Sequence, residues 1–193
     1  MFTAPQSSRS LKANLATFSG LLALAVFALA AQAQEQPKPG PEHKKLEVAV
    51  GEWTYEGSGE ASPFGPAGKF KGKSTARMVL GGFFLESLGE DTGDTGYFFQ
   101  SINLRGYDPV KKVYVDYGFE NDGRATSNTS TVSGTTWTAT GVRTDAKGKA
   151  YKTRGIETYP ADGQTSTFAV EYSADDGKTW LPLWKGTMKK VGK

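Results

Sequence analysis

The sequence contains no cysteine, and this absence excludes several kinds of site. Without thiols the chain forms no disulfide, offers no sulfur ligand to zinc or an iron–sulfur cluster, and has no thiolate nucleophile. The fold must therefore rest on a hydrophobic core, which a chain of 193 residues is long enough to build.

Histidine is nearly absent as well, since His43 is the only one. A Ser-His-Asp triad, a histidine-based acid–base pair or a zinc site with several histidines would all depend on it. His43 precedes the strand-rich part of the sequence, so we interpret it as a surface residue or a residue that closes one end of the fold. We accordingly predict no metal site and no cofactor.

A strong net charge is also lacking. The formal charge is +3, and Arg9 and Lys12 in the N-terminal segment supply two of these charges. The remaining lysines are scattered and form no basic stripe of the kind that binds phosphates. We therefore predict no nucleic-acid partner.

Only one long hydrophobic run is present, at Leu15–Ala30. Arg9 and Lys12 precede it, and an Ala-x-Ala pattern ending at Ala33 follows it, which is typical of a secretory signal peptide. The alternative, an uncleaved membrane anchor, would need about 20 apolar residues, more than this run provides. We expect residues 1–33 to be removed and the protein to be exported, either periplasmic or secreted, without stable membrane insertion.

The rest of the sequence predicts a short linker and one domain. Residues 34–41 are polar and rich in proline, which is typical of an extended linker. Residues 42–193 form the predicted domain, which opens with a short helix at Glu42–Val50. Leu46 and Val50 give that helix one apolar stripe, and Gly51 is a suitable residue to end it.

Beyond Gly51, turn signals recur about every ten residues, which predicts consecutive antiparallel strands. Apolar and polar residues alternate in segments such as Val113–Glu120, so one face of each strand is expected to be buried. About ten such strands would favour closure into a barrel, because closure removes exposed edges, and a two-sheet sandwich is the alternative. The predicted strands are Glu52–Gly59, Gly68–Leu80, Phe83–Glu90, Phe98–Tyr107, Val113–Glu120, Ala125–Val132, Thr136–Arg143, Ala150–Thr158, Thr165–Ser173 and Leu181–Lys190.

The Gly51-Glu52-Trp53 sequence after the helix resembles the start of the first strand in the calycin superfamily, which includes the lipocalins. The resemblance implies an all-β, antiparallel calycin-like barrel in which Trp53 closes one end. It also implies that a late basic side chain packs across Trp53, and Lys185 or Lys189 would be suitable.

A wider set of motifs resembles the family called domain of unknown function 1579. They are Pro41-Glu42-His43 with Leu46, Gly51-x-Trp53, Leu80-Gly81-Gly82-Phe83-Phe84-Leu85, Gly106-Tyr107-Asp108 and Asp176-Gly177-Lys178-Thr179-Trp180. The resemblance covers nearly the whole predicted domain and implies a calycin-like barrel but no reaction. Some related barrels hold haem through a histidine in a late strand, and the late strands here contain none.

Two of these motifs are interpreted as turns. Gly81 and Gly82 allow an unusual backbone conformation between two strands. The segment around Asp176, Gly177 and Trp180 resembles the Asp-box hairpin that repeats in sialidase propellers, but one copy predicts a single turn and no propeller.

A candidate ligand site follows from the expected interior of the barrel, where an arginine, acid and tyrosine network would suit the head group of an anionic ligand. Acids that could pair inside are Glu86, Asp116, Glu157 and Glu171, and arginines available to them are Arg77, Arg105, Arg143 and Arg154. The residues that we assign to the site are Arg77, Glu86, Tyr107, Tyr114, Asp116, Trp137, Arg154 and Trp184.

The leading hypothesis is therefore non-catalytic binding of a small hydrophobic or amphipathic molecule inside the barrel. One alternative is a structural or stress-related envelope protein whose barrel is filled by side chains. The other is a hydrolase or isomerase that works through carboxylate and tyrosine groups. The sequence carries no signal for the identity of a ligand or for the oligomeric state.

Overall fold

The computed structural model describes residues 36–192. The predicted signal peptide, residues 1–33, lies outside this range. Among the described residues, no helix has the length and apolar character needed to cross a membrane.

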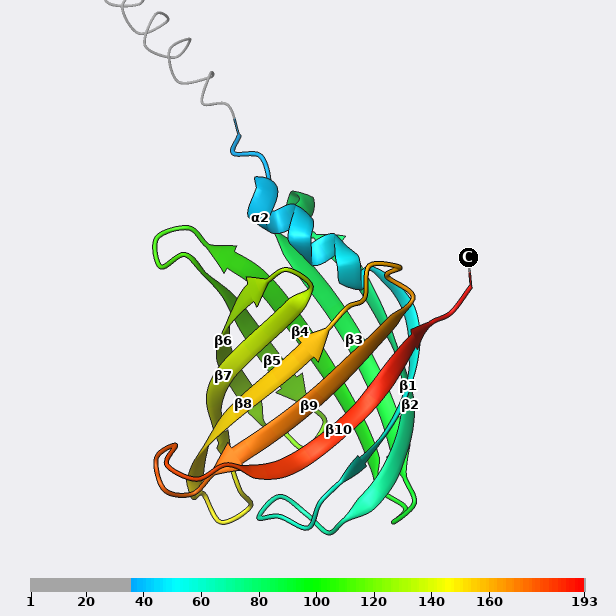
Figure 1. Ribbon diagram of the computed structural model, residues 1–193, viewed down its shortest axis with the longest axis vertical. Coiled ribbons are helices and arrows are strands. Elements are labelled where there is room, and N and C mark those ends of the chain that lie inside the picture. Colours follow the sequence, from blue (N-terminus) through cyan, green and yellow to red (C-terminus); the bar gives the residue numbers. More distant parts are fainter. Residues whose placement is uncertain (1–35, 193) are drawn as a thin grey trace, which may run out of the picture. The chain divides into compact units, whose positions relative to one another are not determined.

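The domain is a closed barrel of ten antiparallel strands, in which each strand pairs with its neighbours in the chain and β1 pairs with β10 (Figure 1). This confirms the all-β barrel, and the alternative two-sheet sandwich was wrong. The strands are β1 Gly51–Gly59, β2 Gly68–Val79, β3 Phe84–Gly93, β4 Phe98–Asp108, β5 Val113–Glu120, β6 Ala125–Ser133, β7 Thr136–Thr144, β8 Ala150–Thr158, β9 Thr165–Ser173 and β10 Leu181–Lys190.

A helical segment covers one end of the barrel. It consists of one α-helical turn, α2 at Pro41–Lys44, which continues as a 3₁₀ helix, η1 at Lys45–Ala49. Leu46 and Ala49 are buried against the barrel end, whereas Val50 is already extended, so the helix stops one residue earlier than predicted. We call Pro41–Ala49 the helical plug.

Trp53 joins the helical plug to the barrel wall. Its side chain is only 2% exposed, and its indole N–H donates a hydrogen bond to the Ala49 carbonyl at 2.9 Å. The basic group across its ring is Lys190, whose Nζ lies 5.1 Å from the ring centroid. The expectation that Lys185 or Lys189 would take this place was wrong, because Trp53 pairs in register with Lys190, and Lys189 faces the other way.

Gly51 is required by the same packing. Its φ of +136° is unfavourable for other residues, and a Cβ atom there would lie 2.6 Å from Cε of Lys190. The glycine in the Gly-x-Trp motif therefore makes room for the lysine that covers the tryptophan.

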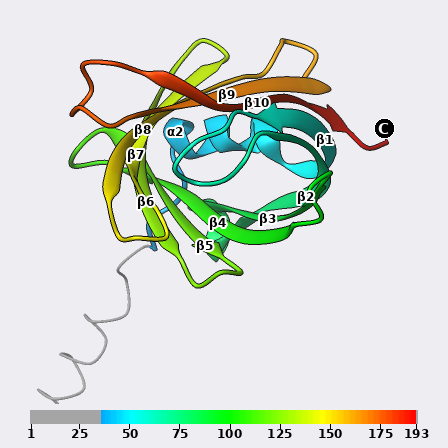
Figure 2. The same cartoon turned by 90° about the horizontal axis from the view of Figure 1, so that it is seen from below.

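The opposite end of the barrel is covered by the loop between β1 and β2, which crosses the opening in Figure 2. Phe64 in this loop packs edge-on against Tyr151 and Tyr172, at 5.4 and 5.8 Å between ring centroids. The Arg143 guanidinium lies 5.6 Å from the Phe64 ring and 5.5 Å from the Trp184 ring. We call this end, with Phe64 at its centre, the lower end.

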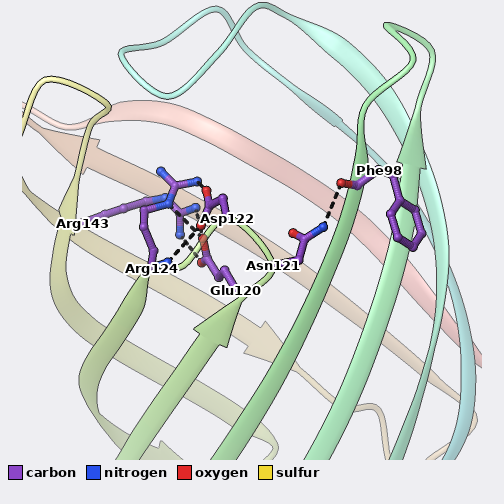
Figure 3. Close-up of polar contacts among 6 residues, drawn as sticks. All are labelled: Phe98, Glu120, Asn121, Asp122, Arg124 and Arg143. Carbon is purple, nitrogen blue, oxygen red and sulfur yellow. Dashed lines mark hydrogen bonds and ion pairs between the residues drawn. The ribbon is translucent and has the colours of Figure 1, made fainter.

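A cluster of charges stabilises the lower end (Figure 3). Glu120, whose side chain is only 7% exposed, accepts two hydrogen bonds from Arg143 at 2.7 and 2.8 Å. Arg124 lies 3.2 Å from the same carboxylate and also pairs with Asp122. A bidentate arginine pair of this kind fixes both side chains, so the arginine that holds Phe64 is itself held.

Both glycine motifs form turns, as expected. Gly81 and Gly82 have φ values of 70° and 92° in a 3₁₀ turn, η2 at Leu80–Gly82, between β2 and β3. In the β9–β10 turn, Asp176 and Gly177 also have positive φ, at 63° and 93°. Trp180 packs against the turn, 3.6 Å from the position that a Gly177 Cβ would occupy.

Candidate functional site

A cavity of about 240 Å³ lies inside the barrel, next to the helical plug. Its apolar side is formed by Ala49, Trp53, Ala76, Leu85 and Met188. Its polar side is formed by Tyr55, Ser74, Ser87, Ser101, Asn103, Arg105, Asp116, Glu157 and Tyr159. A mostly apolar lining with a small set of converging polar groups is the usual composition of a small-molecule site.

Arg105 is the centre of the polar side. Its Nε donates a hydrogen bond to Asp116, and its Nη1 lies 3.7 Å from Glu157 Oε2. The guanidinium also lies 5.0 Å from the centroid of the Trp137 ring, which fixes its plane. Burial opposes the charge, but the two carboxylates outweigh that effect and raise the pKa of Arg105 above its ordinary value. Arg105 is therefore a permanent cation inside the barrel.

The two carboxylates are held by further hydrogen bonds. Ser130 donates to Asp116 at 2.8 Å, and the Tyr159 hydroxyl donates to Glu157 at 2.7 Å. Each acid is thus engaged by Arg105 and by one hydroxyl, which offsets the cost of burying it. The Arg105 side chain is still 22% exposed. In the described part of the chain, its terminal nitrogens donate no hydrogen bond.

A belt of small polar side chains lies beside Arg105. Asn103 donates to Ser101 at 3.1 Å. For Ser74 and Ser87, residues 36–192 supply no side-chain hydrogen bond, although both line the cavity. These hydroxyls are therefore available to a molecule inside it.

A second polar pair lies on the adjoining wall. The Tyr55 hydroxyl donates to Asp91 at 3.1 Å across Gly72, which stands between them in the sheet and whose missing side chain makes room for both. Burial raises the pKa of Asp91 above its usual range. Burial and the neighbouring Asp91 together raise the pKa of Tyr55.

These buried tyrosines predict a loss of stability in alkali. Burial raises the pKa of Tyr55, Tyr114 and Tyr159. In the unfolded chain each ionises near its ordinary value of about 10. Above that pH the unfolded state loses protons that the folded state keeps, so the free energy of unfolding should fall as pH rises. Urea denaturation at pH 8, 9, 10 and 11 would test this, and a constant midpoint would contradict it.

The sequence-predicted site residues divide into two groups, and the larger one faces inward. Asp116 lines the cavity. Tyr114 and Trp137 are buried beneath the helical plug with their ring centroids 4.6 Å apart, and Tyr107 packs beside them. Trp184 lies near the lower end. Of these five, Asp116 alone contacts the cavity.

The other three predicted residues lie on the outer surface. Arg77 pairs with Glu86 at 2.7 Å, and the Arg77 side chain is 73% exposed. Arg154 pairs with Glu171 at 2.5 Å and stacks on Trp180, whose ring centroid is 4.4 Å away. Because Ala76 and Tyr151 face the interior, residues of opposite parity on their strands face outward. These three side chains are not part of the site proposed below.

The central residues of the cavity were not assigned to the site from the sequence. Arg105 and Glu157 were considered as ion-pair partners, whereas Tyr55, Tyr159 and the serines were not assigned to the site. A signal for Arg105 was present, because it stands two residues before Tyr107 on one strand and so shares its face.

The single histidine belongs to the helical plug, as expected. His43 Nδ1 accepts a hydrogen bond from the Gly40 amide at 3.0 Å, and its ring packs against Phe83 and Tyr107. Within residues 36–192, no group of three or more histidine, aspartate or glutamate side chains is placed to hold a metal ion.

Comparison with known proteins gives a fold and a family. The structure is similar to the crystal structure of Rv2717c from M. tuberculosis, with a TM-score of 0.55, 11% sequence identity, and coverage of 79% of this chain and 99% of that one. At this identity the likeness shows the fold alone. No curated protein matches the sequence. The family model described as "Protein of unknown function (DUF1579)" matches residues 38–179, so the chain belongs to the DUF1579 family.

Proposed function

We propose that this protein binds a small, uncharged, partly apolar molecule in the cavity beside the helical plug. The observation that carries the proposal is that polar groups without a hydrogen bond and apolar side chains line the same cavity. Ser74, Ser87 and the Arg105 terminal nitrogens face the cavity without a hydrogen bond from residues 36–192, and Trp53 and Leu85, the cross-strand neighbours of Ser74 and Arg105, supply apolar surface beside them.

The size of the cavity limits the ligand. A volume of about 240 Å³ corresponds to about eight water molecules at their share of liquid volume. A compact molecule of similar size fits, whereas a long acyl chain does not.

The charges around Arg105 favour a neutral ligand. One buried cation faces two carboxylates, so the group already has a negative balance, and an anionic ligand would increase the repulsion. Asp116 and Glu157 are already engaged, so a cationic ligand would have to break existing bonds. A carbonyl or hydroxyl oxygen could instead accept from the Arg105 terminal nitrogens while Asp116 keeps its bond from Nε and Glu157 keeps its bond from Tyr159. This replaces the anionic head group expected from the sequence.

The cavity also bears on the alternative functions. A barrel filled by side chains would leave no lined space, so the cavity favours binding over a purely structural role. Asp116 and Glu157 do converge, as an acid–base pair would require, but both are fixed to Arg105 and to a hydroxyl. The arrangement therefore supports holding a guanidinium in place more than it supports proton transfer.

We propose in addition that binding takes place after export. The support for this is the N-terminal sequence, where a charged segment, the apolar run Leu15–Ala30 and the Ala-x-Ala pattern stand in the order of a signal peptide.

The binding proposal predicts that filling the cavity displaces the ligand. Ser74→Leu places a larger apolar side chain in the cavity, whereas Thr75→Leu, one residue further on, places the same side chain on the outer surface. The measurement is native against denaturing mass spectrometry of protein purified from its own compartment. We expect an excess mass in the native spectra of the wild type and Thr75→Leu, and its loss in Ser74→Leu.

Two results would contradict the proposal. One is a bare native mass for the wild type together with no change in melting temperature on addition of small neutral carbonyl compounds and alcohols. The other is an excess mass that Ser74→Leu retains while circular dichroism shows that the variant is folded.

A further inference from the structure

Charged side chains are distributed unevenly on the outer surface of the barrel. Along β4 from Phe98 to Gly106, and along the whole of β5, β6 and β7, no outward-facing residue is charged. Asp108, at the end of β4, is outward-facing and charged. All other outward-facing charged residues of the barrel strands lie on the remaining six strands. These residues are Lys152, Arg154, Glu171, Lys185, Lys189, Glu52, Glu56, Lys69, Lys71, Lys73, Arg77, Glu86 and Glu90. We call the outward face of β4–β7 the uncharged wall.

Large hydrophobic side chains are exposed where this wall meets β3. Leu88, Ile102 and Phe119 stand opposite one another on β3, β4 and β5, in direct register. They are 44%, 48% and 51% exposed. Tyr117, which is 44% exposed, extends the patch along β5. A contiguous exposed patch of this kind marks an interaction surface more often than a surface left to solvent.

The topology limits how a partner can bind. A closed barrel has no free strand edge, so a partner must pack on a face and cannot extend the sheet. In Figure 2, β4 and β5 lie on the side of the barrel opposite β9 and β10. At its other boundary the uncharged wall adjoins β3, which pairs with β4 and carries Glu86 and Glu90.

The chemistry of the wall excludes charged partners. Nucleic acid, a charged peptide or an anionic membrane would each need lysine, arginine or acidic side chains as counterparts. A second copy of the same wall needs none, because two uncharged faces can be buried together without leaving an unpaired charge. A two-fold axis brings the same surface of two copies into contact.

The size of the wall fits that arrangement. Four strands about 4.8 Å apart, with about nine residues each at about 3.3 Å per residue, cover about 20 by 30 Å. That footprint of about 600 Å² approaches the about 800 Å² per partner that a standard interface buries. We propose that the uncharged wall is the interface of a homodimer, in which Ile102 and Phe119 become buried.

The oligomeric state tests this proposal. We expect sedimentation velocity of the mature protein to show a dimer at about 100 μM that dissociates on dilution into the low micromolar range. Phe119→Lys should weaken association at least about tenfold, because it places one lysine from each copy in the interface. The matched control is Thr167→Lys, which adds the same charge to the outward face of β9 and should leave the dimer unchanged.

Other outcomes would overturn the homodimer. A wild type that stays monomeric at about 100 μM would contradict the homodimer. A dimer that persists in Phe119→Lys would contradict it too, provided that circular dichroism and the melting temperature show that the variant is folded. A monomeric wild type that co-floats with phosphatidylcholine vesicles, and loses this in Phe119→Lys, would assign the wall to a neutral lipid surface instead.

Discussion

Replacing Arg105 by leucine is expected to lower the free energy of unfolding by about 3–5 kcal/mol, which is a large part of the total stability of about 5–15 kcal/mol of an ordinary domain. The reason is that the substitution leaves the two carboxylates that pair with Arg105 without a counter-charge. Asp116 and Glu157 are 16% and 22% exposed, and without the guanidinium they stay inside the barrel as uncompensated charges. Urea denaturation of the wild type and Arg105→Leu at pH 7 measures the difference.

The outer surface supplies a matched control. Arg77 also pairs with a carboxylate, at 2.7 Å from Glu86, but its side chain is 73% exposed. Water and ions screen such a pair, so Arg77→Leu should change the free energy of unfolding by less than about 1 kcal/mol. Equal effects of the two substitutions would mean that Asp116 and Glu157 are hydrated in the folded protein.

The pH dependence of the same variant separates loss of charge pairing from loss of packing. Without Arg105, the two acids stay inside the barrel as unpaired charges, and acid removes that cost by neutralising them. The deficit of Arg105→Leu relative to the wild type should therefore shrink as pH falls from 7 towards 4. A deficit independent of pH would indicate that packing around Trp137 is the cause.

The barrel could be predicted from the sequence because residues within each turn determine where that turn forms. Glycines at 123, 134, 148 and 163 each follow a predicted strand, and each adopts positive φ. Such glycines end a strand regardless of what surrounds them, so the strand bounds at these turns were within a residue of those observed.

The same local signals failed where tertiary pairing overrides them. The segment from Asp91 to Gly96 was interpreted as a loop, but β3 continues to Gly93. Asp91 pairs in register with Gly72 on one side and Phe99 on the other, and its carboxylate binds Tyr55. Pairing of this kind with both neighbours outweighs the poor strand propensity of aspartate and glycine.

The candidate site could be predicted only in part, since it depends on which face of each strand points inward. Alternation shows that Arg77 and Met78 face opposite ways, but the direction that is inside is set by closure of the whole barrel. An error of one position moves a residue from the cavity to the surface. Arg77 and Arg105 illustrate this, because both are strand arginines paired to an acid on the next strand, and the structure places the first outside and the second inside.

Trp53→Ala is expected to lower the free energy of unfolding by about 3–5 kcal/mol, because it removes a fully buried indole and leaves a void between the helical plug and the barrel. Trp53 also donates to the Ala49 carbonyl and packs edge-on against Tyr159 at 5.9 Å between ring centroids. Trp53→Phe keeps a ring in place but loses the hydrogen bond, so its cost should be much smaller, about 1–2 kcal/mol.

The two variants also test how the plug is held. If Trp53 anchors the helical plug, amide hydrogen exchange at Leu46 and Ala49 should accelerate in Trp53→Ala by more than the loss of global stability accounts for. In Trp53→Phe the exchange at these amides should follow global unfolding, as in the wild type. Equal acceleration throughout the barrel would instead show that the plug and the ten strands unfold as one unit. In that case the plug would not open by itself to admit a ligand to the cavity.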